Sequence, residues 1–117
     1  MSAETALYAL LSGNAGVTAL VSTRVYPDLI PEKVAIPYIG FERTGSAPAT
    51  TLEGSVLAER VDIVIACWSA TRIQANQIAD AVRAALAGTS WRYAGSGSEV
   101  DEATGRLAAT LQVSLQT

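Results

Sequence analysis

The sequence predicts an α+β protein with a mostly antiparallel sheet of about four to five strands and two main helices packed on one face. Three stretches carry this prediction. Residues 57–68 and 107–115 alternate apolar and other side chains with the period of a strand, and residues 72–86 repeat them with the period of a helix. Because these elements interleave along 117 residues without a linker or repeat, we expect a single domain over residues 1–117.

The stretch 57–86 joins an apolar strand to a long helix and is the expected nucleus of the fold. One strand face collects Val61, Ile63, Ile65 and Cys67. Ser69 is the candidate N-cap of the helix, and Gly88 is its candidate stop. The helix gathers its apolar residues on one stripe: Ala75, Ile78, Ala79, Val82 and Leu86. The strand and the helix each have one apolar face, so we expect these two faces to pack against each other.

The first part of the chain predicts two amphipathic helical segments and two strands. A helical stripe runs through residues 3–11 and ends at Gly13, and Asn14 can cap a short second helical segment. Residues 24–27 predict a brief strand that proline ends, and residues 28–35 a loop. Residues 38–43 then predict a second strand.

Residues 44–56 are rich in small side chains and contain a single charge, so they predict a long, mobile loop between two antiparallel strands. Structureless loops of this length are uncommon in small domains and are often functional. The alternative is the plain tip of a hairpin.

The last part of the chain predicts a short strand at 91–93, a turn at 95–98 and an acidic stretch at 99–102 with a second turn near Gly105. The clearest strand of the sequence then follows, with one face formed by Leu107, Ala109, Leu111, Val113 and Leu115.

The residue types speak against catalysis and against a bound cofactor or metal. The chain has no histidine, which removes the commonest general base and metal ligand. Cys67 lies among strand residues and predicts a small core side chain. The acidic cluster Glu99, Asp101 and Glu102 lacks the spacing of a calcium loop and predicts a solvated turn. Trp68 and Trp91 adjoin strands and predict core or interface positions.

Composition and charge limit the classes of partner that the protein can be expected to bind. The net charge is −3 and the basic residues are scattered, so we expect no sequence-specific binding of nucleic acid. The longest apolar run, residues 63–68, is too short to cross a membrane. Charged residues make up only 16% of the chain, which indicates either an apolar surface meant for a partner or simply an alanine-rich protein.

Five segments occur in an order that resembles the tail-completion proteins of long-tailed bacteriophages and prophages, also called tail-terminator or head-to-tail joining proteins. They are LYALL (7–11), RVYP (24–27), IPY (36–38), CWSA (67–70) and ADAVRAAL (79–86). No single segment is diagnostic, and the resemblance rests on the ordered set. It covers almost the whole chain and is thinnest at 44–56 and 94–105.

This resemblance implies a structural protein that caps the finished tail tube, stops its polymerisation and joins the tail to the head connector. It implies a homo-oligomeric ring, usually a hexamer and possibly formed only on the tail, with the tail-tube subunit and a neck protein as partners. It also implies assembly in the host cytoplasm followed by residence at the tail–head junction of the virion. Neither an active site nor a cofactor is implied.

Within this hypothesis the loop at 44–56 docks on a partner. Its interface residues would be Gly45, Ser46, Ala47, Pro48, Ala49, Thr50, Thr51, Leu52, Glu53 and Gly54. Two alternatives remain open: a small dimeric α+β binding or adaptor module, and a neck or head-completion protein of similar fold. An enzyme is a distant third because histidine is absent.

Overall fold

The structure is a computed structural model that describes residues 3–27, 35–50 and 56–116. Its helices and strands follow the chain in the order α1 (Ala3–Ser12), α2 (Ala15–Val21), β1 (Val25–Pro27), β2 (Tyr38–Thr50), β3 (Val56–Ser69), α3 (Arg72–Leu86), β4 (Trp91–Asp101) and β5 (Arg106–Gln116).

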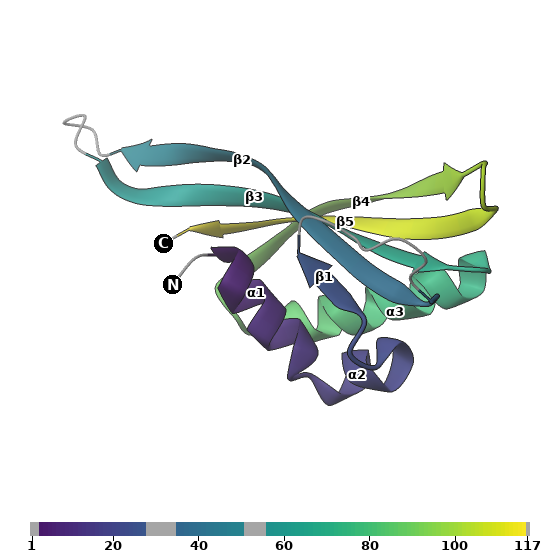
Figure 1. Ribbon diagram of the computed structural model, residues 1–117. Coiled ribbons are helices and arrows are strands. Elements are labelled where there is room, and N and C mark those ends of the chain that lie inside the picture. The colour runs from purple at the N-terminus through teal and green to yellow at the C-terminus, as the bar shows by residue number, and fades with distance from the viewer. Residues whose placement is uncertain (1–2, 28–34, 51–55, 117) are drawn as a thin grey trace.

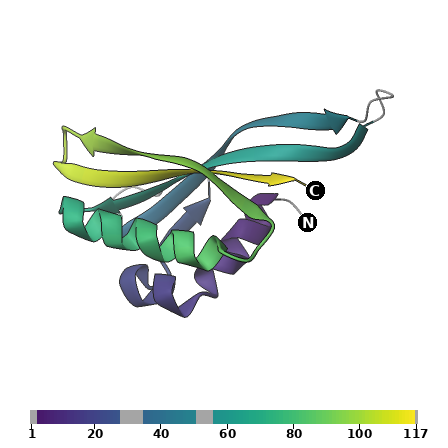
Figure 2. The same ribbon diagram turned by 180° about the vertical axis from the view of Figure 1, so that it is seen from behind.

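The strands form one five-stranded mixed sheet in the order β1-β2-β3-β5-β4. β1 is parallel to β2, and the remaining neighbours are antiparallel. The helices lie on one face of this sheet, and the described residues place no helix on the opposite face (Figures 1 and 2). The predicted α+β class is therefore confirmed, with α2 added to the two main helices α1 and α3.

The core lies between the helical layer and the face of the sheet predicted from the alternation in β3. Ile63, Ile65 and Cys67 are at most 1% exposed, and the predicted stripe of α3 is buried against them. Apolar residues of the other helices complete the same cluster: Leu7, Leu11, Val17 and Val21. One face of the five-stranded sheet and the apolar stripes of three helices thus exclude water together, which is the main stabilising contribution to this fold.

The helix caps confirm one prediction and correct another. Asn14 caps α2 as predicted, because its side chain accepts a hydrogen bond from Val17 N at 3.1 Å. The prediction that Ser69 caps α3 is wrong. β3 continues through Ser69, which pairs with Leu107, so the helix begins later and Thr71 becomes its N-cap.

Replacing Thr71 with alanine is expected to lower the free energy of unfolding by about 1 kcal/mol. Thr71 Oγ1 accepts a hydrogen bond from Gln74 N at 3.2 Å, and alanine would leave that N–H to the solvent. Chemical denaturation monitored by circular dichroism measures the change. Thr18→Ala is the matched control, since Thr18 lies inside α2, where its hydroxyl donates to Ala15 O and caps no helix N–H. Equal losses in both variants would contradict a capping role for Thr71.

β4 is longer than predicted and contains the segment that was expected to turn. The prediction of a short strand at 91–93 followed by a turn at 95–98 is wrong, because pairing with β5 continues from Trp91 to Asp101. Small residues are required in part of this ladder: a Cβ on Gly97 would come within 3.0 Å of Thr110 Oγ1. The turn near Gly105 is confirmed, with Gly105 at φ +74°.

The largest correction concerns residues 44–56. β2 does not end at Arg43 but continues to Thr50, and β3 begins at Val56. The predicted long loop is therefore strand over most of its length. Backbone pairing with the neighbouring strand outweighs the weak strand preference of glycine, alanine and proline in this segment. Residues 51–55 lie outside the described part of the chain.

Candidate assembly surface

The most distinctive feature of the molecule is a two-stranded arm, defined here as residues 45–50 of β2 and 56–60 of β3. β5 accompanies β3 only as far as the pair Arg60–Gln116. Beyond that point β2 and β3 pair only with each other within the described residues, through to the pair Thr50–Val56. Figures 1 and 2 show the arm projecting from the body of the protein. The largest extent of the whole molecule is 50 Å.

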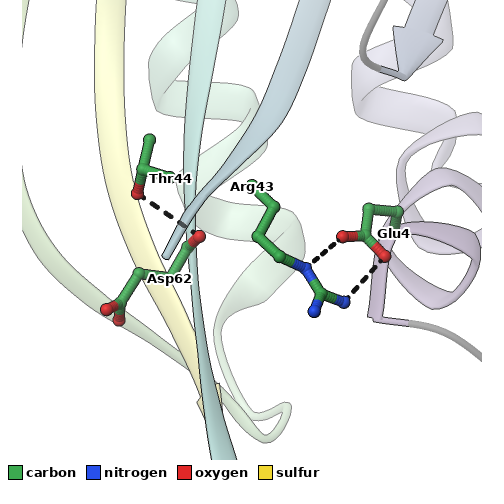
Figure 3. Close-up of polar contacts among 4 residues, drawn as sticks. All are labelled: Glu4, Arg43, Thr44 and Asp62. Carbon is green, nitrogen blue, oxygen red and sulfur yellow. Dashed lines mark hydrogen bonds and ion pairs between the residues drawn. The ribbon is translucent and has the colours of Figure 1, made fainter. Parts of the chain in front are cut away.

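The arm begins at a β-bulge. The register between β2 and β3 shifts between Arg43 and Gly45, so that Thr44 is an extra residue with no partner of its own in β3. Its hydroxyl donates instead to Asp62 O at 3.4 Å across the pair (Figure 3). A bulge bends a strand and increases its local twist. The bulge therefore marks the place where the hairpin leaves the sheet.

A bidentate ion pair ties the root of the arm to α1. Arg43 Nε donates to Glu4 Oε1 at 2.5 Å, and Arg43 Nη2 donates to Glu4 Oε2 at 3.0 Å (Figure 3). Two parallel hydrogen bonds fix the direction of the guanidinium as well as its position. The residue next to the bulge is thus held against the helical layer.

Replacing Arg43 with glutamine is expected to lower the free energy of unfolding by about 0.5–1 kcal/mol at low salt, and by less at 1 M NaCl, because the pair is partly exposed and is screened by ions. Denaturation curves at both salt concentrations measure this difference. Arg60→Gln is the control. Its pair with Asp62, at 3.4 Å, is more exposed and should contribute less. A loss for Arg43→Gln that does not change with salt would contradict the electrostatic explanation.

The arm gains little stability from the rest of the chain. A two-stranded ribbon without a third strand or a packed face is at best marginally stable in water. Gly45–Thr50, the β2 strand of the arm, carries no charge, while the β3 strand ends in Glu59 and Arg60 at the root of the arm. A ribbon with an uncharged edge strand and free backbone groups is a typical surface for pairing with another chain. The arm is therefore the strongest candidate for a contact with a partner.

The predicted interface residues fall into two groups. Gly45, Ser46, Ala47, Pro48, Ala49 and Thr50 lie in the β2 strand of the arm. Thr51, Leu52, Glu53 and Gly54 lie outside the described residues. Sequence reasoning thus singled out this segment but assigned it the wrong conformation, and its role as an interface stays a prediction. The ion pair that anchors it was not predicted, since nothing local connects Glu4 with Arg43.

Hollows in the described surface do not bring catalytic groups together. A cleft of about 630 Å³ between α1 and β1 contains Glu4, whose carboxylate already binds Arg43. Cys67 is fully buried, and burial raises the pKa of its thiol to about 12, so it stays protonated at neutral pH. Over the residues that the structure covers, no group of three or more acidic, cysteine or histidine side chains is placed to hold a metal ion.

The two tryptophans occupy different environments. Trp91 is 7% exposed and belongs to the core, which is one of the two positions, core or interface, predicted for it. Trp68 is half-buried on the face without helices, where it stacks on Tyr38 with ring centroids 6.4 Å apart. Among the described residues, no helix is long and apolar enough to span a membrane.

Fold and surface together define a small α+β protein with a projecting β-ribbon. The same fold occurs in a chain from the virion of a native gene transfer agent particle. The two chains superpose with a TM-score of 0.83 over 98% of this chain and 93% of that one. Their sequences are 23% identical, so this likeness concerns the fold alone. No curated protein matches the sequence.

A protein family described as tail completion protein gp17 matches residues 5–113. The chain therefore belongs to this tail completion family, which confirms the resemblance found in its sequence. Membership gives it a structural role in the assembly of phage tails.

Proposed function

We propose that this protein caps the tail tube: it binds the end of the finished tube, stops further polymerisation and presents the surface to which the head connector joins. Family membership supports a role in tail completion. The observation that carries the finer proposal is the arm, a preformed β-ribbon with an uncharged β2 strand that projects from the body and has no third strand among the described residues. In this proposal the arm is a docking element, and the protein has no catalytic activity.

The capping protein acts as a homo-oligomeric ring, most simply a hexamer that matches a hexameric tube. A closed ring of identical subunits needs two unlike patches on each subunit. The arm supplies one patch, and the body at the other end of the long sheet supplies the second (Figures 1 and 2). Assembly takes place in the host cytoplasm, and the ring then stays at the tail–head junction of the virion.

The test is a mixture of this protein with the tail-tube subunit of the same particle, followed by electron microscopy of the tubes. Capping predicts tubes of limited length with an added ring at one end, and a shorter mean length as the ratio of cap to tube subunit rises. Tubes that grow as long as those without the protein would contradict capping. Binding to the head connector in the absence of any tube binding would favour a neck protein instead.

We also expect the isolated protein to be a monomer or a weak oligomer, since the tube end that templates the ring is missing. Light scattering across a concentration series measures this. A stable hexamer at micromolar concentration would show that the ring forms without a template. A discrete dimer with no effect on tubes would favour an adaptor module.

A further inference from the structure

The second edge strand of the sheet, β4, also has unused backbone groups. In an antiparallel pair, facing residues alternate between those whose N–H and C=O point at each other and those whose groups point away. Ile39 donates its N–H to the O atom of Arg24, the residue just before β1, which fixes this alternation for β2. The registers of β3 and β5 extend this alternation to β4. There the N–H and C=O groups of Ser96, Ser98 and Val100 point away from β5, toward the open edge of the sheet.

This edge lacks most of the features that keep strands from pairing. Residues 94–100 contain neither proline nor lysine, and their only charge is Glu99. A groove of about 280 Å³ runs between β4 and α3, lined by Asn76, Asp80, Arg83, Tyr93 and Ser96 among others. An edge strand beside a helix is a recurrent geometry for binding an extended segment by strand addition. The backbone gives affinity there, and the groove receives side chains.

We infer that the β4 edge of one subunit receives the arm of a second copy, so that the sheet continues from subunit to subunit. This inference rests on the proposed ring and names the partner of the arm within it. Gly45–Thr50 and Gly95–Val100 are extended segments of equal length with free outer edges among the described residues. The arm segment Gly45–Thr50 is uncharged, so it brings no like charge to Glu99, which is the one charge of the β4 segment.

The positions of the two edges favour a second copy over a fold-back within one chain. The arm and the second half of β4 project toward opposite ends of the molecule (Figures 1 and 2). One subunit therefore cannot pair its own arm with its own β4. Two unlike edges that meet between copies form a head-to-tail contact, the type that closes into a ring.

Pro48 removes one hydrogen-bond donor from the outer edge of β2, the edge that we infer to pair. It faces Glu59 in β3 at a position where, by the same alternation, the backbone groups of both residues point away from each other. The proline nitrogen thus faces the outer edge of β2, where it offers no hydrogen to a neighbour. The strand pairing between two copies would therefore lack the hydrogen bond that a backbone N–H at residue 48 would donate.

Two substitutions with opposite effects test the inference. Ser98→Pro removes an outward N–H from β4 but no hydrogen bond to β5, and it should weaken association between copies by roughly tenfold or more. Pro48→Ala adds the missing donor and should tighten association by roughly fivefold. Ser98→Ala is the control and should leave association unchanged. Association is measured by light scattering and on capped tubes, with circular dichroism to confirm folding.

Cross-linking identifies the partners directly. One chain carries Ala49→Cys, a second carries Ser98→Cys, and a short bis-maleimide is added to each alone and to the mixture. We expect cross-linked dimers in the mixture and few in either sample alone, with the unmodified chain unreactive because Cys67 is buried.

Dimers in either sample alone would indicate a symmetric contact and overturn the inference. So would a failure to cross-link together with no change on Ser98→Pro and Pro48→Ala. If tubes are still capped in that case, the proposed function stands and the arm binds another partner. If the cross-link forms and tubes are not capped, the contact between copies is correct and the capping function is wrong.

Discussion

Replacing residues 48–59 by an Asn-Gly turn is expected to leave a folded body and to abolish capping of the tail tube. Ala47 and Arg60 face each other with their backbone groups paired, so a short turn can close the hairpin at this point. The described residues among those removed have no partner in β5, and the core residues Val61, Ile63 and Ile65 remain. Tube growth in the presence of this variant should equal growth without any cap.

The control for the arm deletion is Gln77→Ala, an exposed change on α3 that should cap like the original protein. Circular dichroism and denaturation establish whether the deleted chain is folded. A folded variant that still limits tube length, with rings still formed, would reject the arm as the docking element. An unfolded variant would contradict the claim that the body does not depend on the arm.

Replacing Ile65 with alanine is expected to lower the free energy of unfolding by about 3 kcal/mol, within the range of about 2–5 kcal/mol for buried large-to-alanine changes. Ile65 is completely buried in the central strand β3, between Phe41 in β2 and Leu111 in β5. Its truncation opens a cavity where two neighbouring strands and the helical layer leave no room to collapse. The free energy of unfolding of a small domain is only about 5–15 kcal/mol, so the midpoint of denaturation should shift clearly.

Val64→Ala is the matched control for Ile65→Ala. Val64 is the preceding residue of the same strand, but it is half-buried on the face that carries no helix. Its truncation should cost about 1 kcal/mol or less, since solvent can fill the space. Equal losses at both positions would show that the helix-free face contributes as much to stability as the covered one.

The elements predicted correctly are those with one face in water and one in the core. β3, β5 and α3 show their periods because Ile63, Val113 and Val82 are buried while their chain neighbours are not. Local pattern and tertiary burial agree there, so the sequence is sufficient.

The arm and β4 were missed for the opposite reason. Residues 94–100 are almost all exposed in the isolated subunit, so neither face selects apolar side chains and no alternation appears. Their glycine and serine residues then resemble turns. Backbone pairing with the next strand of the same hairpin decides their conformation, and such pairing selects no particular side chains. The assignment of Gly45–Thr50 to an interface stays a prediction.

The bulge at Thr44 has a consequence for how uniquely the hairpin is aligned. If Thr44 took Asp62 as its partner and the extra residue vanished, every later residue of β2 would move one step along β3. Pro48 would then face Ala58 with its nitrogen toward the ladder, where a donor is required. Slippage is therefore penalised by a missing hydrogen bond. The proline and the bulge together specify the strand register of a ribbon whose side-chain pattern alone would specify it weakly.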